Sequence, residues 1–175
     1  MCMQVFNKEV VTLMAKLNER PIVFPLSNPT HLAECTAAEA WQWTNGTVLF
    51  ASGSPFDPVV FKGVTYVPGQ GNNAYIFPGI GLGVVAGGLR QVTDDMFRRA
   101  ARSLADLVSP EDQAKGSLFP PLGHLREVSR RLAVAVLCEG VRSGLATRVE
   151  RVEEAEEAVR REMYDPSYLK RSCRL

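Results

Sequence analysis

The sequence has almost no net charge and no hydrophobic run long enough to cross a membrane. Its formal net charge is +1, which gives no electrostatic reason to expect a nucleic acid or an anionic membrane surface as a partner. The longest apolar run, residues 75–89, is shorter than the roughly 20 residues that span a bilayer. It also contains Pro78 and several glycines. We therefore expect neither a nucleic acid nor a membrane as partner.

Cysteine and histidine are too sparse and too scattered to predict a disulfide framework or a zinc site. No CxxC pair and no Cys/His pairing occurs, a pattern typical of reduced intracellular thiols. His31 and His124 have no cysteine or paired carboxylate at ligand spacing, so we expect them at surface or cap positions. The first ten residues lack the basic region and apolar core of a signal peptide. The cysteines are Cys2, Cys35, Cys138 and Cys173.

What the sequence does contain predicts an α/β fold. The chain has 175 residues, 46% of them hydrophobic, enough for one domain with a sizeable core. Residues 22–26 and 47–51 are short buried strand patterns, although Pro25 makes a central position doubtful. Polar turns follow both, at residues 27–30 and 52–58. This succession indicates a parallel sheet, in which ligands bind beyond the carboxyl ends of the strands.

Helices are predicted by apolar spacing and by capping residues. Thr36 and Glu39 form a capping-box pattern that starts a helix at about Ala37. Thr93 caps a helix that runs to about Val108, and residues 59–67 form a small hairpin. Further helical patterns cover residues 9–17, 109–112, 126–142 and 152–163. In the last of these we expect i,i+4 ion pairs Glu156–Arg160 and Glu157–Arg161.

Two glycine patterns compete in residues 79–88. Gly81-x-Gly83-x-x-Ala86 has the shape of a dinucleotide-binding loop, but Pro78 precedes it where a strand should lie. Gly79, Gly83 and Gly87 are spaced by four, which would let another element pack closely on one helix face. We favour helix packing. Residues 52–55 lack the G-x-S-x-G of a nucleophile elbow, and we interpret them as a structural turn.

Three asparagines follow the predicted strands or precede the glycine-rich helix. Asn72 and Asn73 lie in PGQGNNAYIFPG (residues 68–79), and Asn28 lies in the turn after the first strand. Their amides offer two donors and an acceptor each, so they suit a small polar ligand. Two plain alternatives stay open. Asn28 is also typical of a turn residue that bonds its own backbone, and Asn72 and Asn73 are typical helix N-caps.

Four segments, in this order and spacing, resemble malic enzyme. They are RPIVFPLSNPT (residues 20–30), AECTA (33–37), LFASGSPF (49–56) and PGQGNNAYIFPG (68–79). The likeness continues through FPPL (119–122), so it covers residues 9–168. Residues 1–8 look unlike the family, and residues 169–175 form a tail. The resemblance implies the C-terminal part of a Rossmann-like doubly wound parallel sheet, followed by long helices.

Malic enzymes oxidise malate with NAD or NADP and decarboxylate the product to pyruvate with Mg²⁺ or Mn²⁺. The resemblance implies that Asn28 lies beside malate and the nicotinamide end of the cofactor, and that Asn72 and Asn73 line the malate pocket. The family's Tyr/Lys acid/base pair, its three acidic metal ligands and its phosphate loop are expected upstream. Tyr66 and Lys62 fall in the wrong segment to replace the acid/base pair, so we assign this chain no catalytic and no metal residue.

Two functional hypotheses follow from the resemblance. In the first, the chain is a malic enzyme segment that supplies malate and nicotinamide contacts but is inactive alone. In the second, it is a non-catalytic module that associates with a complete malic enzyme subunit. The family is usually oligomeric, so we expect a homo-oligomer for the complete protein. The cytoplasm is the expected location, with the mitochondrial matrix or a plastid as alternatives. The choice between NAD and NADP stays open.

Overall fold

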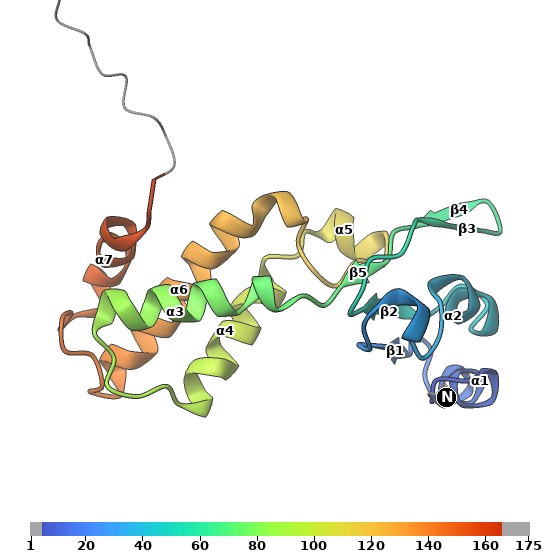
Figure 1. The fold of residues 1–175 in the computed structure, drawn as a ribbon, viewed down its shortest axis with the longest axis horizontal. Helices are drawn as coiled ribbons and strands as arrows, with labels where there is room; N and C mark the ends of the chain where they lie inside the picture. Colours follow the sequence, from blue (N-terminus) through green and yellow to red (C-terminus); the bar gives the residue numbers. More distant parts are fainter. Residues whose placement is uncertain (1–4, 166–175) are drawn as a thin grey trace, which may run out of the picture.

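The computed structural model describes residues 5–165 and has two lobes. A sheet lobe holds the first part of the chain, and a helical lobe holds most of the remainder (Figure 1). The expected boundary between residues 168 and 169 lies outside the described residues, and so does half of the expected N-terminal segment 1–8. The α/β class expected from the sequence is confirmed.

The sheet lobe is built around three short parallel strands in the order β1-β2-β5. Ile22 pairs with Leu49 and Val23 with Phe50, while Ala51 pairs with Gly69. The parallel sheet was predicted, but β5 was not, and the first strand is shorter than its pattern suggested. The elements of this lobe are α1 (Lys8–Leu17), β1 (Ile22–Val23), α2 (Ala37–Trp43), β2 (Leu49–Ser52) and β5 (Gly69–Gln70), with a 3₁₀ turn η1 (Thr30–Leu32).

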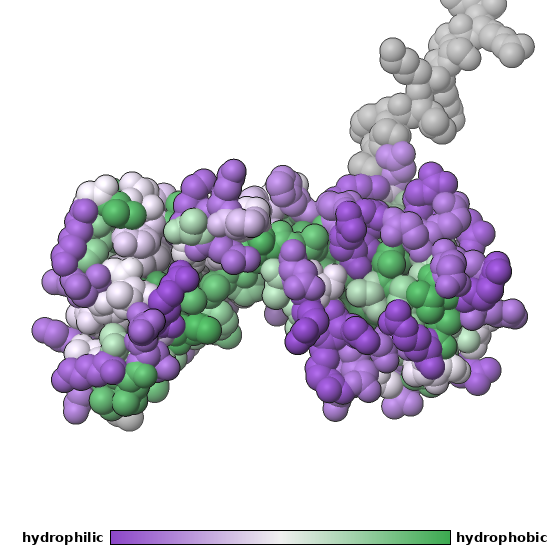
Figure 2. Space-filling model, turned by 180° about the vertical axis from the view of Figure 1, so that it is seen from behind, coloured by the Kyte–Doolittle hydropathy of each residue, from purple (hydrophilic) through white to green (hydrophobic). Residues whose placement is uncertain are grey.

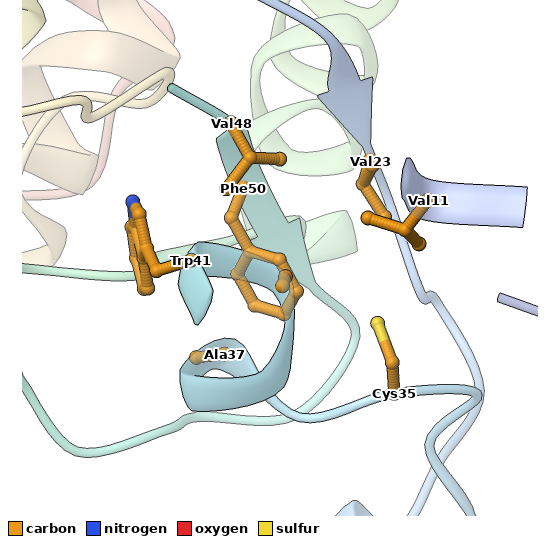
Figure 3. Packing of buried hydrophobic residues seen from close by; sticks show 8 residues of the cluster. Val11, Val23, Cys35, Ala37, Trp41, Val48 and Phe50 are labelled. Atoms are coloured by element: carbon orange, nitrogen blue, oxygen red, sulfur yellow. The ribbon is translucent and has the colours of Figure 1, made fainter. Parts of the chain in front are cut away.

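One face of this sheet packs against α1 and α2. Val11 of α1 meets Val23 of β1, and the Cys35 sulfur points toward both (Figure 3). Trp41 of α2 is fully buried and lies on Phe50 of β2, with ring centroids 5.6 Å apart. Thr36 and Glu39 form the predicted capping box at the start of α2. Local caps and apolar spacing therefore place the helices that cover this face.

A β-hairpin extends from the sheet lobe, as predicted. Strands β3 (Val59–Phe61) and β4 (Val64–Tyr66) pair antiparallel, with Lys62 and Gly63 both at positive φ in the turn. Tyr66 stacks on Trp41 at 5.0 Å between ring centroids. This stacking attaches the base of the hairpin to α2.

The helical lobe is organised around α6, which contacts α3, α4 and α7. Its middle is buried at Leu132, Ala133, Val136 and Leu137. Because α6 is covered on several sides, its apolar residues need not keep to a single stripe. The elements are α3 (Phe77–Gly87), α4 (Asp94–Asp106), α6 (Leu125–Arg142) and α7 (Ala155–Glu162), with 3₁₀ turns η2 (Asn73–Tyr75), η3 (Leu122–His124) and η4 (Val152–Glu154). The short helix α5 (Pro110–Ala114), between α4 and α6 in the chain, lies beside β5 (Figure 1).

Glycines of α3 form the face that packs on α6. A Cβ at Gly83 would lie 2.8 Å from the Ala133 carbonyl oxygen, and one at Gly79 would lie 2.7 Å from the Leu132 Cβ. A Cβ at Gly87 would meet the Leu137 side chain at 2.3 Å. The two helices thus run side by side in the same direction. The packing interpretation of this glycine pattern is confirmed, and the run from Gly81 to Ala86 forms no phosphate loop.

The expected i,i+4 ion pairs in α7 were wrong. Arg160 pairs with Glu157, three residues earlier, and Glu156 pairs with Arg130 of α6. Both ion pairs involve exposed carboxylates, and such surface pairs are weak. Spacing along one helix therefore does not fix which opposite charge each carboxylate contacts. Glu156 faces α6, so a neighbouring helix supplies its partner.

The two lobes meet at Phe119. Its ring lies 5.3 Å from that of Tyr75 and 6.4 Å from that of Phe24, measured between centroids. The Tyr75 hydroxyl donates a hydrogen bond to the Pro120 carbonyl oxygen at 2.5 Å. Phe119 therefore links Phe24, the residue after β1, to Tyr75 of the 3₁₀ turn η2 that leads into α3.

Candidate functional site

The three parallel strands end at the same edge of the sheet, and each is followed by polar residues. Backbone hydrogen bonds hold the three following loops together. Gly53 N donates to Pro25 O at 3.1 Å, and Gly71 N donates to Ser52 O at 2.8 Å. Ligands in open α/β sheets bind outside this edge, and the loops that carry the candidate asparagines begin here.

Asn28 is held by the loop that follows β2. The buried Ser54 hydroxyl donates to Asn28 Oδ1 at 2.5 Å. The loops approach so closely that a Cβ at Gly53 would lie 2.3 Å from the Leu26 carbonyl oxygen. The plain alternative, a side chain bonded to its own backbone, is therefore wrong for Asn28. Its carbonyl is fixed by Ser54, and its exposed amide remains as a hydrogen-bond donor.

Asn72 acts as a helix cap, as one of the two alternatives expected. Its Oδ1 accepts a hydrogen bond from Ala74 N at 2.8 Å. The capped element is the 3₁₀ turn η2, whereas α3 begins later, at Phe77. The expectation that the asparagines sit at the N-terminus of the long glycine-rich helix was thus wrong by one turn. Within this 3₁₀ turn, Tyr75 is buried and stacks on Phe119.

Asn73 is exposed beside Asn72, at the start of η2. Its carbonyl oxygen accepts from Ile76 N at 3.0 Å, so its backbone belongs to the turn. Both side chains lie on the segment that follows β5, and Asn28 follows β1. All three asparagines are exposed, and all three follow strands that end at one edge of the sheet. Asn72 and Asn73 lie on the same short turn.

The site is made of neutral amides and hydroxyls. Cys35 lies in the core of the sheet lobe, where burial, with smaller effects of Glu39 and Glu34, raises the pKa of its thiol to about 12 and so disfavours the thiolate. Within residues 5–165, no group of three or more His, Cys, Asp or Glu side chains is placed to hold a metal ion. None of the helices described is long and apolar enough to cross a bilayer. Neutral amides can orient an anion without adding a competing charge.

Two residues of this edge were not singled out from the sequence. Ser54 was considered only as part of a turn, yet it fixes Asn28. Gln70 ends β5 and its Nε2 donates to the Gly53 carbonyl oxygen at 3.4 Å. A polar residue directly after a buried strand is a usable signal for Ser54. No local pattern marks Gln70, because its strand forms only by pairing with β2.

The fold and this edge define part of a dinucleotide-binding α/β domain. Residues 2–141 match the family model described as "Malic enzyme, NAD binding domain". The chain belongs to this malic enzyme family. The expected resemblance is therefore confirmed.

Curated relatives give the same result over nearly the whole chain. The chain is 49% identical over 165 residues to "NADP-dependent malic enzyme 4, chloroplastic" of Arabidopsis thaliana. The aligned residues make up 94% of this chain and 26% of that protein. It is 50% identical over 163 residues to the NADP-dependent malic enzyme of Dictyostelium discoideum, or 93% and 30% of the two chains. The chain thus spans about a quarter to a third of the length of these relatives.

Solved structures agree. The malic enzyme of Pyrococcus horikoshii Ot3 matches 90% of this chain and 32% of its own, with a TM-score of 0.66 and 29% identity. The malic enzyme of Entamoeba histolytica matches 91% of this chain with a TM-score of 0.71, and at 22% identity it supports the fold alone.

Proposed function

We propose that this chain supplies one wall of the substrate and cofactor site of a malic enzyme. In this proposal Asn28 contacts malate and the nicotinamide end of NAD or NADP, and Asn72 and Asn73 contact malate. The observation that carries the proposal is the shared sheet edge, where Ser54 fixes Asn28 beside the loop that follows β2. NADP is the preferred cofactor of the proposal, because the Arabidopsis and Dictyostelium relatives are named as NADP-dependent.

The proposed role of the asparagines is to position the substrate. The cofactor accepts a hydride when it is bound, and the protein must orient the donor carbon toward it. Amide N–H groups that hold a carboxylate or hydroxyl restrict the substrate to the reactive geometry. They transfer no proton at neutral pH. The chemistry of proton transfer and decarboxylation therefore belongs to groups other than these three.

The divalent metal of the proposed reaction does not fit the described residues. Residues 5–165 place no group of three or more His, Cys, Asp or Glu side chains where it could hold a metal ion, and Mg²⁺ or Mn²⁺ needs oxygen ligands such as carboxylates. In the proposal, the metal ligands and the acid/base pair come from the part of a malic enzyme that this chain does not match. We therefore expect the purified chain alone to be inactive.

A chimera tests the proposed roles. Residues 5–165 would replace the matched region of the Dictyostelium enzyme, with malate-dependent NADP reduction as the readout. Asn72→Ala and Asn73→Ala are each expected to raise KM for malate about tenfold or more, the cost of a lost hydrogen bond to a charged group. Asn18→Ala is the matched control, because Asn18 caps α1 far from this edge. Unchanged kinetics in both variants would overturn the proposal.

The isolated chain gives a second test. Mixed with malate, NADP and Mn²⁺, it should reduce no cofactor. Steady reduction would contradict the proposal that the catalytic groups lie outside this chain.

The location can be examined with a fluorescent fusion of the complete protein. The Arabidopsis relative is named chloroplastic, so a plastid stands beside the cytoplasm as a proposed compartment. A homo-oligomer of the complete enzyme also remains a prediction.

A further inference from the structure

A cavity of about 380 Å³ lies at the junction of the two lobes. We call it the junction cavity. One wall comes from the loop after β2 and from β5 with the residues just before it, and the other comes from the segment that joins α5 to η3. Its volume falls in the range of small-molecule sites, about 300–1,000 Å³, and such sites occur preferentially between domains. Asn28, Asn72 and Asn73 are not among the residues that line it.

Most side chains of the junction cavity are apolar. Phe56 and Val67 line one wall, and Phe119 and Leu122 line the other. Val67 and Leu122 are 47% and 49% exposed, so each has apolar surface that a ligand could cover. Apolar surface where the lobes meet is visible in Figure 2. An apolar and aromatic lining of this kind favours a ligand with an apolar body.

Contacts within the protein hold both walls of the junction cavity in place. Phe56 packs edge-on against the buried Phe50, with ring centroids 6.0 Å apart. Phe119 stacks on Tyr75, and the Ser117 hydroxyl donates a hydrogen bond to the Phe119 carbonyl oxygen at 2.9 Å. The aromatic walls are therefore ordered before a ligand binds, which lowers the entropic cost of binding.

Two charged residues line the junction cavity, and one of them is free to bind a ligand. Asp112 Oδ2 accepts a hydrogen bond from the Ser109 hydroxyl at 2.7 Å, in the turn that caps α5. Lys115 lies at the other end of α5 and has no carboxylate partner within residues 5–165. Its ammonium group carries three donors and a full positive charge. A ligand with one carboxylate would match this single free charge.

We propose that the junction cavity binds a small aromatic carboxylate that contacts both lobes. The ring of the ligand lies between Val67 and Leu122, where aromatic side chains of the walls can pack against it. The carboxylate binds Lys115. Because Leu122 belongs to η3 and Val67 precedes β5, the bound ligand connects the helical lobe to the sheet lobe. This site is additional to the proposed function and does not depend on the roles of the asparagines.

The lining favours this class of ligand over others. A dicarboxylate such as malate would place its second charge against apolar side chains or Asp112, and an unpaired charge is costly to bury. A nucleotide carries several negative charges, whereas Lys115 is the only cation among the described residues that line the cavity. A neutral aromatic compound would gain no contact with Lys115. The competing occupant is a segment from the part of a malic enzyme that this chain does not match.

Titration of the full 175-residue chain with 3-phenylpropionate tests the site. The chain is labelled at the methyl groups of valine and leucine and followed by NMR. We expect a dissociation constant of the order of 1 mM, as suits so small a ligand, and NOEs from the ring protons to the methyls of Val67 and Leu122. Val60, at a 71% exposed position of the hairpin, is the internal control and should show none. NOEs only to other methyls would overturn the proposal.

Matched variants separate the carboxylate contact from apolar binding. Lys115→Met should weaken binding of 3-phenylpropionate about fivefold, the effect of one exposed ion pair. It should leave the uncharged 3-phenylpropanamide unaffected, because methionine retains an apolar stem. Lys16→Met, at an exposed lysine of α1, is the matched control and should change neither. Leu122→Asp should abolish binding of 3-phenylpropionate. Equal effects of Lys115→Met and Lys16→Met would contradict the proposal.

The chimera with the Dictyostelium enzyme keeps the test independent of how the chain folds alone. Saturation-transfer NMR should detect 3-phenylpropionate on the chimera, with a weaker signal in Lys115→Met. Absence of binding to the chimera would mean that another part of the enzyme fills the cavity, and the proposal would be overturned. The readout is separate from malate kinetics. If Asn72→Ala and Asn73→Ala leave KM for malate unchanged while 3-phenylpropionate binds, this site stands and the proposed function fails.

Discussion

The Ser54 hydroxyl donates a hydrogen bond of 2.5 Å to Asn28 Oδ1 and thereby joins the loops that follow β1 and β2. Ser54 is only 6% exposed, whereas Asn28 reaches solvent. The buried Ser54 hydroxyl thus fixes the orientation of the exposed Asn28 amide. It spans 26 residues of sequence, so no local pattern could have predicted it.

Ser54→Ala should loosen Asn28 while leaving the fold intact. The loss of one hydrogen bond is expected to lower the free energy of unfolding by about 1 kcal/mol. The side-chain amide of Asn28, followed by NMR, should lose its fixed environment. Ser143→Ala is a suitable control, because Ser143 bonds only carbonyl groups of its own helix at an exposed position. A rigid Asn28 amide in Ser54→Ala would contradict the anchoring role.

Gly83→Ala should destabilise the helical lobe, whereas Gly81→Ala should not. A Cβ at Gly83 would meet the Ala133 carbonyl oxygen at 2.8 Å and Val136 Cβ at 3.2 Å, so α3 and α6 must move apart. We expect a loss of about 1–3 kcal/mol. A Cβ at Gly81 has nothing within 4 Å, and alanine should stabilise the helix by about 1 kcal/mol. Urea denaturation of both variants measures the difference, and equal effects would refute the packing.

Tyr75→Phe should weaken the junction of the lobes. The substitution keeps the ring against Phe119 but removes the donor to Pro120 O, leaving a buried carbonyl without its partner. A cost of about 1–3 kcal/mol is expected, measurable by chemical denaturation at pH 7. No loss of stability would show that this carbonyl is satisfied in another way.

The pH dependence of the free energy of unfolding above pH 10 provides a second readout for Tyr75. Burial raises the pKa of the Tyr75 hydroxyl above its ordinary value of 10.0. The neutral form is therefore favoured by folding, so its contribution is present below pH 10 and is lost as the pH rises through the raised pKa. The difference in the free energy of unfolding between the native chain and Tyr75→Phe should therefore shrink as the pH rises through the raised pKa of Tyr75.

Glu127 should contribute to stability at neutral pH and lose that contribution in acid. Hydrogen bonds from Arg130 and Arg131 lower the pKa of its carboxyl from 4.5 to about 2. A group with a lowered folded pKa stabilises above its unfolded value, and this effect disappears as the pH falls from 4.5 toward 2. The carboxylate is half exposed, so solvent screening keeps the effect small. NMR titration of the carboxyl carbon, with Glu127→Gln as the reference for stability, measures both.

Helices were predicted well because their signals are local. Thr36, Thr93 and Ser109 each accept a hydrogen bond from a backbone N–H in the first turn of the helix that follows. Their partners lie within three residues, so the sequence alone specifies them. The glycine face of α3 was also correctly assigned, because a spacing of four already implies close packing.

The missed features depend on contacts between distant segments. Gly69 and Gln70 have no strand propensity of their own, and they form β5 only because β2 lies beside them. Glu156 was assigned to Arg160 because Arg130 is remote in sequence, although it is near in space. The candidate site divides in the same way. The cap at Asn72 is local, whereas the anchoring of Asn28 by Ser54 is not.

The connection from β5 through η2 to α3 carries Asn72 and Asn73 across the junction of the lobes, whereas Asn28 stays with the sheet. Any rotation of the helical lobe about Phe119 would therefore change the spacing between these amides. A ligand that bridges Asn28 and the Asn72–Asn73 turn would fix the angle between the lobes. Ligand affinity and the angle between the lobes would then depend on each other, because such a ligand binds best to the arrangement of the lobes that gives it both contacts.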